Sequence, residues 1–349
     1  MRSIKDQLEE YRAKHKNSLE ERVSTIRQQS PGGLAEPDSQ NAAPALHRAS
    51  AETDPSVHFS TLTVLSWNVD GLDNRFTKTR ARGLVSAMLT ELPFAAMLQE
   101  VNQEVERLLK RRLSKKYYMV TTKACNRRAN YYNMLLLARD RVTVTDSSTL
   151  WFPDSCMARH LLWVRAEVSL ESYSVPMWLG TSHLESLGPH SEERVNQLKI
   201  CMHEAEAAGD QGRLVVLGGD LNLREREAKL AVSGTPFMDV WGLNGAPESA
   251  KFTWDTENNH NTDMSGASYR PRMRLDRVYT LPFHHACFHV HTSDFRLLGT
   301  TVLPDIELFI SDHFGVAFDM GVSHHERKRL RESVNSSPVA KRSKTVCEG

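Results

Sequence analysis

The central part of this 349-residue chain alternates short apolar runs with helix-like patterns, and this alternation constrains the fold most. Apolar runs bounded by polar residues or glycine predict strands at 61–67, 94–99, 131–138, 161–168, 175–182, 213–219, 274–281 and 314–320. Apolar residues three and four apart predict helices at 80–92, 105–113 and 191–209, the last capped by Ser191 and ended by Gly209. Strands interleaved with helices indicate one α/β domain rather than two separate folds.

Two terminal segments differ from this pattern and divide the chain into 1–57, 58–321 and 322–349. In the first segment, apolar residues recur at helical spacing between Ile4 and Ile26, and a linker rich in Pro, Gly and Ala follows. This amphipathic helix either docks on a partner, which the sequence leaves unknown, or is a solvated helix of marginal stability. We expect both terminal segments to be flexible extensions of the central domain.

The last segment carries two basic clusters, RKRLR (327–331) and KRSK (341–344). Paired basic clusters are typical of nuclear-import signals, and the alternative is a merely soluble tail. We therefore expect the protein in the nucleus, with the cytoplasm as a second compartment.

The balance of charge limits the kinds of partner. The chain has 44 Lys and Arg against 43 Asp and Glu, so a uniformly basic nucleic-acid coat is excluded and a polyanion must be bound at a local site. No window approaches the roughly 18–20 apolar residues that a bilayer span needs, so we expect no membrane partner. The five widely spaced cysteines favour a reducing compartment over a disulfide framework or a structural zinc site.

Polar residues suited to metal or phosphate chemistry follow most of the apolar runs. They are Asn68, Glu100, His183, Asp220 with Asn222 two residues on, Asp276, and the pair Asp312 and His313. Because ligands bind beyond the carboxyl ends of strands in α/β sheets, we expect these side chains to meet at one rim. Each alone has an ordinary explanation as a turn or helix-capping residue. Six such positions together are hard to explain as loop composition.

These residue types favour metal-assisted hydrolysis of a phosphodiester. Mg²⁺ prefers oxygen ligands and is typically held by one or two carboxylates, which fits Glu100 with Asn68 beside it. An Asp can activate a water, a His can stabilise charge that grows on phosphoryl oxygens, and a second Asp can keep that His protonated. The sequence contains no GxxxxGK[ST] loop, HExxH or GxSxG motif.

Seven segments resemble the exonuclease–endonuclease–phosphatase superfamily in their order. They are SWNVDGLD (66–73), LQEV (98–101), TSHLES (181–186), GGDLNLRERE (218–227), FTWDT (252–256), RLDRVY (274–279) and SDHFGV (311–316). RARG (80–83), ER-x-NQLK (193–199) and TWDT narrow the resemblance to the branch that hydrolyses 5′-phosphotyrosyl bonds. The resemblance covers roughly residues 60–320. It implies an α/β four-layer sandwich, in which two mixed β-sheets are flanked by helices.

The resemblance also implies roles for the matching residues. Glu100 would be the principal metal ligand, with Asn68 and Asp312 near the metal. Asp220 would activate the water, and Asp276 would orient His313. Asn222, His183 and His313 would contact the scissile phosphate. Ser186, Arg224, Trp254 and Tyr131 would bind the 5′ strand. Core packing is the alternative for both aromatic residues; we favour the site for Trp254 and consider Tyr131 evenly balanced.

The resemblance implies a Mg²⁺-dependent phosphodiesterase, with Mn²⁺ as a possible substitute, that removes tyrosyl adducts of trapped topoisomerases from DNA 5′ ends. Single-stranded ends are the expected substrate. The sequence departs from the family pattern at Gly188, where an Arg is expected, so one phosphate contact is in doubt. Alternatives are another superfamily enzyme, such as an RNA deadenylase, an abasic-site endonuclease or a phosphatase, or a scaffold without activity.

Overall fold

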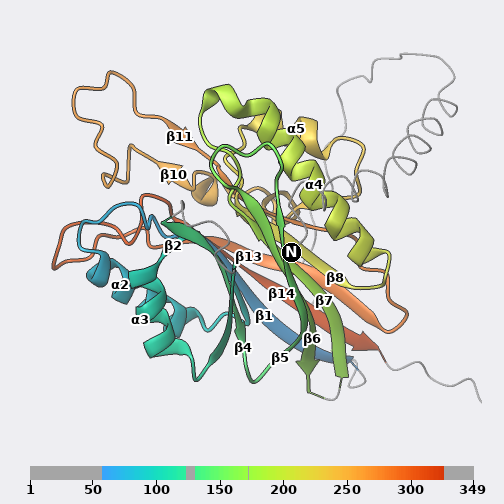
Figure 1. Ribbon diagram of the computed structural model, residues 1–349. Helices are drawn as coiled ribbons and strands as arrows, with labels where there is room; N and C mark the ends of the chain where they lie inside the picture. The colour runs from blue at the N-terminus through green and yellow to red at the C-terminus, as the bar shows by residue number, and fades with distance from the viewer. Residues whose placement is uncertain (1–56, 123–129, 172, 326–349) are drawn as a thin grey trace, which may run out of the picture.

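The computed structural model describes residues 57–122, 130–171 and 173–325, so the predicted N-terminal helix and both basic tail clusters lie outside the described residues. The described chain forms two six-stranded sheets that face each other, with helices outside them (Figure 1). The first sheet has the order β13 (Phe288–Leu298), β14 (Gly315–His325), β1 (Val57–Asn68), β2 (Ala95–Asn102), β4 (Tyr131–Ala138) and β3 (Tyr117–Thr121). The second has the order β5 (Val142–Trp151), β6 (His160–Leu170), β7 (Tyr173–Ser182), β8 (Leu214–Asp220), β12 (Asp276–Thr280) and β9 (Met238–Asp239).

Both sheets are mixed. β1 pairs with β2 in parallel, and β7 pairs with β8 in parallel. The remaining neighbouring strands of the two sheets pair antiparallel. A separate pair of two-residue strands, β10 (Trp254–Asp255) and β11 (Arg272–Met273), lies in the long connection before β12.

Amphipathic helices cover the outer faces of the sheets. α2 (Thr77–Glu91) and α3 (Gln103–Leu113) lie beside the first sheet, and α4 (Ser191–Gly209) and α5 (Glu225–Val232) lie beside the second (Figure 1). In α4, Leu198 and Met202 pack into a buried cluster with Trp178 of β7 and Leu217 of β8. The short helix α6 (Val240–Leu243) and the 3₁₀ turns Gly188–His190 and Glu248–Ala250 complete the described elements.

One apolar core joins the two sheets. It includes Leu65 and Leu98 from the first sheet and Val164, Leu179 and Val216 from the second. Two sheets with a shared core and helices outside form four layers, which confirms the predicted fold class. None of the helices in the described part of the chain has the length and apolar composition that a bilayer crossing requires.

The sequence missed the strands at the edges of the sheets. β5 and β13 are edge strands with many exposed side chains, so they lack the apolar runs that revealed the central strands. The expected cap at Ser191 is wrong. A 3₁₀ turn leads directly into α4, so Ser191 is already helical, and His190 precedes the helix without a side-chain cap. Helix α4 ends at Gly209 as predicted.

Candidate active site

Six elements bring the predicted polar residues to one rim of the sandwich. The structure places Asn68 at the end of β1, Glu100 near the end of β2, His183 just after β7, Asp220 at the end of β8, Asp276 at the start of β12 and His313 just before β14. The expectation that Asp276 and His313 follow strands is wrong. Because β12 and β14 run antiparallel to β8 and β1, the beginnings of these strands meet the rim.

A β-bulge directs Glu100 towards this rim. The pairing of β2 with β4 shifts between Leu98 and Val101, and Glu100 adopts a left-handed backbone with φ 55°. The loop after β1 packs closely on the bulge, since a Cβ on Gly71 would lie 1.9 Å from the Glu100 carbonyl oxygen. Bulges and left-handed non-glycine residues cost stability and are enriched beside active sites, where they aim a side chain.

Asn68 links Glu100 to Asp220. Its Nδ2 donates to Asp220 Oδ2 at 2.9 Å and to Glu100 Oε1 at 3.3 Å. Its Oδ1 accepts the backbone N–H of Asp70 at 2.9 Å. Asn222, with φ 53°, donates its backbone N–H to Asp220 Oδ1 at 3.1 Å, so both oxygens of Asp220 are held.

His313 and Asp276 form a buried ion pair. His313 Nδ1 lies 2.8 Å from Asp276 Oδ2, and His313 Nε2 lies 3.8 Å from Asp220 Oδ2. Burial alone would lower the pKa of His313, but the charges of Asp276, Asp220 and Asp312 together outweigh burial and raise that pKa well above its usual value. His313 is therefore an imidazolium at neutral pH, as the sequence argument required.

His183, unlike His313, is neutral. Arg159 Nη1 lies 2.7 Å from His183 Nδ1, and since a guanidinium can only donate, Nδ1 is the acceptor. Burial first, and then the positive charges of Arg159 and His313, lower the pKa of His183 well below its usual value. The neutral ring carries its proton on Nε2, which faces Asp220 Oδ2 at 3.3 Å.

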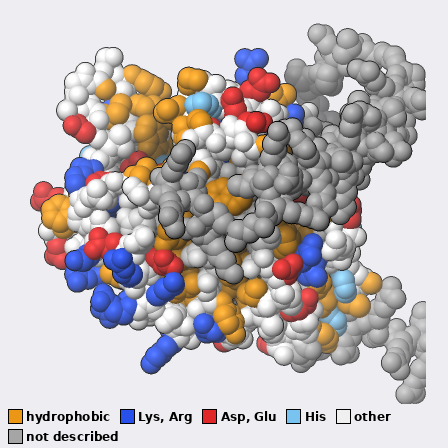
Figure 2. Space-filling model, viewed as in Figure 1, with side chains coloured by type: hydrophobic (Ala, Val, Ile, Leu, Met, Phe, Trp, Pro, Cys, Tyr) orange, Lys and Arg blue, Asp and Glu red, His pale blue; other side chains and the backbone are white. Residues whose placement is uncertain are grey.

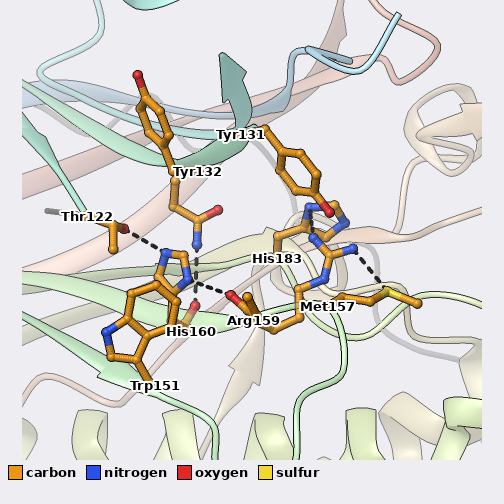
Figure 3. Close-up of a pocket in the computed structure, with 10 residues that line it drawn as sticks. Thr122, Tyr131, Tyr132, Trp151, Met157, Arg159, His160 and His183 are labelled. Carbon is orange, nitrogen blue, oxygen red and sulfur yellow. Dashed lines mark hydrogen bonds between the residues drawn. The ribbon is translucent and has the colours of Figure 1, made fainter. Parts of the chain in front are cut away.

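Arg159 is a site residue that sequence reasoning missed. It is 4% exposed, also donates to Ser186 Oγ at 3.0 Å, and its guanidinium carbon lies 5.5 Å from the centre of the Tyr131 ring. Figure 3 shows the Tyr131 hydroxyl and the Arg159 guanidinium converging on His183. Arg159 precedes a strand in sequence like many surface arginines, so no local pattern distinguished it.

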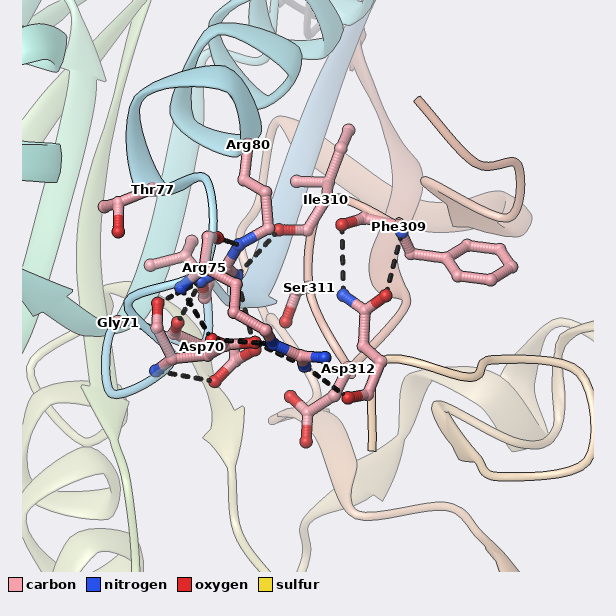
Figure 4. Close-up of polar contacts among 12 residues, drawn as sticks. Asp70, Gly71, Arg75, Thr77, Arg80, Phe309, Ile310, Ser311 and Asp312 are labelled. Carbon is pink, nitrogen blue, oxygen red and sulfur yellow. Dashed lines mark hydrogen bonds and ion pairs between the residues drawn. The ribbon is translucent and has the colours of Figure 1, made fainter. Parts of the chain in front are cut away.

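The carboxylates of Asp70, Glu100 and Asp312 form a second group of charges at this rim. Burial, followed by the charges of Asp312 and Glu100, raises the pKa of Asp70 to about 7, although the charge of Arg80 acts to lower it. Burial, followed by the charge of Asp312, raises the pKa of Glu100. Asp70 is a second residue that we did not single out, although it lies in the SWNVDGLD segment. Figure 4 shows Asp70 near Asp312 and held by Arg80.

These oxygens fit a divalent cation. Crowded, partly buried carboxylates with raised pKa values are stabilised when a cation lies among them, and carboxylate and amide oxygens suit a hard ion such as Mg²⁺. Among the described residues, Asp220, Asp276 and His313 also lie close enough to share an ion. His313 Nδ1 is already paired with Asp276 there.

The predicted substrate residues lie around the same rim. Trp254 is half-buried and donates its Nε1–H to Asp312 Oδ2 at 3.2 Å, and its backbone bridges to His313. Tyr131 is half-buried, with its ring centre 6.2 Å from that of His183. Ser186 contacts Arg159, as described above. All three therefore adjoin the catalytic groups rather than the apolar core.

Arg224 lies next to the departure at Gly188. The side chain of Arg224 is 49% exposed and pairs with Glu227 at 3.3 Å. A Cβ on Gly188 would lie 3.8 Å from Arg224 Nη2. The Arg224 guanidinium thus lies where a side chain at position 188 would begin, so a positive charge is present at this point of the rim despite the glycine.

The chain matches the Endonuclease/Exonuclease/phosphatase family model over residues 65–313. It belongs to this family. Tyrosyl-DNA phosphodiesterase 2 of Homo sapiens is 33% identical over 267 residues, which are 75% of this chain and 69% of that protein. The protein of the same name from Danio rerio is 33% identical over 263 residues, 74% of this chain and 67% of that protein. The family member described here is therefore an enzyme, a hydrolase that acts as a phosphodiesterase.

Solved structures agree with this family assignment. The structure of D. rerio TDP2 complexed with single strand DNA product has a TM-score of 0.68 at 31% identity and covers 75% of this chain and 99% of that chain. TDP2 from C. elegans has a TM-score of 0.64 at 28% identity and covers 76% of this chain and 75% of that chain. Members of this family depend on a divalent metal ion, which agrees with the oxygen-rich rim.

Proposed function

We propose that this enzyme hydrolyses the bond between a DNA 5′-phosphate and a tyrosine hydroxyl. The observation that carries the proposal is the position of Asp220 between a neutral and a charged histidine, beside the carboxylate group of Asp70, Glu100 and Asp312. Removal of trapped topoisomerase adducts, and hence DNA repair, is the role that this reaction would serve. The likeness to tyrosyl-DNA phosphodiesterase 2 proteins supports it.

Asp220 is the group that would activate the attacking water. It is 2% exposed, and burial raises the pKa of its carboxyl, which makes its carboxylate a stronger base. Asn68 and Asn222 fix both oxygens, so the free lone pairs of the carboxylate point in a defined direction. Asp220 would hold the water in line with the phosphorus atom and take its proton.

The two histidines would stabilise the charge that develops on the phosphoryl oxygens. The His313 imidazolium donates through Nε2 and keeps its charge through Asp276, while neutral His183 donates through Nε2 and is fixed by Arg159. Preorganised donors of this kind are worth roughly 3–4 kcal/mol each in a water-excluded site. Asn222 would add a further donor from the end of β8.

Glu100, Asn68 and Asp312 would hold Mg²⁺, and Mn²⁺ is expected to replace it because both ions accept oxygen ligands. When bound, the ion supplies a Lewis acid at the phosphoryl oxygens. A phenol ionises near pH 10, so tyrosine is a good leaving group and the chain needs little general-acid help.

The 5′ strand would lie along Ser186, Arg224 and Trp254, with Tyr131 beside the scissile bond. A single-stranded end fits this rim best, because Trp254 can stack on an unpaired base, which contributes about 1–3 kcal/mol. The relative solved with a single-stranded DNA product supports this substrate.

The test is release of tyrosine from a 5′-phosphotyrosyl single-stranded oligonucleotide, with Mg²⁺ and with EDTA. We expect metal-dependent release that leaves a 5′-phosphate and that Asp220→Asn abolishes. The melting temperature of this variant should be no lower than that of the parent, because burial raises the pKa of Asp220. The matched control is Asp319→Asn, which removes a carboxylate of β14 that accepts a hydrogen bond from Thr63, and it should retain activity. Equal release by Asp220→Asn would contradict the role of Asp220.

We also propose nuclear residence, with a cytoplasmic fraction, from the basic clusters of residues 322–349. A fluorescent protein fused to residues 322–349 should enrich in the nucleus. The same fusion with the KRSK and RKRLR clusters changed to alanine should not. Equal distribution of the two fusions would remove this support.

A further inference from the structure

A positively charged surface lies away from the active site. It consists of seven exposed cations, which we call the basic patch: Lys110, Arg111, Arg112, Lys115, Lys116, Arg139 and Arg141. They come from the end of α3, the turn into β3 and the turn between β4 and β5. Figure 2 shows Lys and Arg side chains gathered over the side of the molecule where α3 lies. Within the described residues, only Lys110 of this set has a carboxylate at ion-pair distance, Glu106 at 2.7 Å.

The patch has shape as well as charge. Lys115, Lys116, Arg139 and Arg141 line a hollow of about 450 Å³ together with Asp140 and residues of β1 that include Thr61 and Thr63. At its edge, the Arg139 guanidinium lies 3.9 Å above the centre of the Tyr118 ring, which is 39% exposed. Arg139 also donates its Nε–H to the Ser114 carbonyl oxygen at 2.8 Å, so this stacked pair is fixed.

This combination favours nucleic acid over an acidic peptide. A cluster of unpaired cations attracts any polyanion, but an ordered guanidinium–aromatic stack beside it adds a planar surface on which a base can stack. The central domain is close to electrically neutral, with 29 basic and 31 acidic residues in 58–321, so a local cluster is where a phosphate backbone would be attracted.

The position of the patch sets how far from the reacting end it would act. β4 starts at Tyr131 beside the site and ends at Ala138 beside the patch, seven residue steps of about 3.3 Å, or about 23 Å. α3 runs the same way from its cap at Asn102, over 11 residues and about 16 Å. For a stacked strand that rises 3.4 Å per nucleotide along this line, the patch is about five to seven nucleotides from the scissile bond.

We propose that the basic patch is a second nucleic-acid contact, which binds the phosphate backbone of the substrate about five to seven nucleotides inside the reacting 5′ end. The inference rests on the proposed function for its substrate. It assigns to the enzyme a preference for long DNA over short oligonucleotides that the catalytic rim alone would not give.

The variant Lys115→Ala/Lys116→Ala tests this proposal, with Lys199→Ala/Lys229→Ala on α4 and α5 as the control matched in charge. The substrates are a four-nucleotide 5′-phosphotyrosyl strand, which reaches only the rim, and a 20-base-pair duplex whose 5′-phosphotyrosyl end is a four-nucleotide overhang. Each lost phosphate contact weakens binding about eightfold at 0.1 M salt. We therefore expect KM for the duplex to rise about 10- to 60-fold, with kcat and the KM of the short strand unchanged.

The salt dependence gives a second readout. The slope of log KM for the duplex against log salt should fall by about 1.8 in the patch variant, from 0.9 for each of two contacts, and stay constant in the control. An equal change on both substrates, or no change on either, would overturn the proposal. The proposal would also be overturned if a poly-glutamate peptide bound only when Lys115 and Lys116 were present while the KM for DNA did not depend on them. That result would assign the patch to a protein partner.

Failure of the proposed function would be visible separately. An enzyme that released no tyrosine from the short strand would refute the function and leave the patch testable. For that case, fluorescence anisotropy of a labelled 20-base-pair duplex without an adduct measures binding alone. Weaker binding by the patch variant than by the control supports the second contact, and equal binding overturns it.

Discussion

Replacement of Asp276 by Asn tests how much the negative charge beside the His313 imidazolium contributes to activity. The amide oxygen can still accept from His313 Nδ1, so the ring keeps its tautomer and loses its anionic partner. The bond spans 2.8 Å between side chains that are 7% and 0% exposed. Hydrogen bonds to charged groups contribute about 1.5–3 kcal/mol. If this contribution is realised in the transition state, kcat falls about 10- to 150-fold at pH 7.

The pH profile separates this charge effect from general damage. Burial opposes the protonated ring, and Asp276, Asp220 and Asp312 outweigh it, so the pKa of His313 is raised and activity is lost only as pH rises through that value. Without the Asp276 charge the pKa falls, and the alkaline limb of kcat moves to lower pH. The assay is tyrosine release between pH 6 and 10, with Asp319→Asn as control. An unshifted alkaline limb and an unchanged kcat would refute the reasoning.

Three further outcomes follow from the buried charges. Glu100→Gln should melt at a higher temperature than the parent in EDTA at pH 8, because burial and Asp312 raise the pKa of Glu100 and its charge therefore destabilises the fold. Added Mg²⁺ should stabilise only the parent, and equal stabilisation of both proteins would contradict the role of Glu100 as a ligand. Breaking the Arg194–Glu227 pair with Glu227→Gln should cost about 3–5 kcal/mol in urea denaturation at pH 7. Burial opposes the Glu227 charge, but hydrogen bonds, led by that from Arg194, lower the pKa of Glu227 to about 2. The difference in unfolding free energy between the parent and Glu227→Gln should therefore vanish as pH falls from about 4.5 to about 2. A difference that persists at pH 2 would contradict a stabilising Arg194–Glu227 ion pair. Arg159→Met should raise the pKa of His183 in an NMR titration, because a cation beside Nδ1 is removed, although burial keeps that pKa below its usual value; an unchanged titration would mean that Arg159 does not set the charge state.

The central strands and the rim could be predicted from sequence because they depend on local pattern. Buried strands such as β8 are continuous apolar runs, and the residue that ends each run is read directly from the chain. Asn68, Glu100, His183 and Asp220 were found in this way. Asp276 and His313 were found by the same rule, although they begin or precede strands; the strand direction that places them at the rim depends on pairing with β8 and β1, which no local pattern encodes.

Arg159 and Asp70 show where sequence reasoning stops. The importance of Arg159 comes from its burial and from contacts with His183 and Ser186, which are 24 and 27 residues away. The raised pKa of Asp70 comes first from burial and then from the charge of Asp312, which lies in a distant loop. Neither contact leaves a periodic signal. Five of the seven cations of the basic patch lie within residues 110–116, but the nearly neutral total charge of the domain drew attention away from this run. Only the fold brings Arg139 and Arg141 beside it.

The most direct test of the account compares three substrates with one preparation of the enzyme in Mg²⁺: a 5′-phosphotyrosyl single-stranded oligonucleotide, poly(A) RNA, and a duplex with an abasic site. We expect kcat/KM for tyrosine release to exceed that for either other substrate by at least about 100-fold, because a phenolate leaves without acid help. Faster shortening of poly(A) or faster cutting at the abasic site would keep the hydrolase and contradict the phosphotyrosyl assignment.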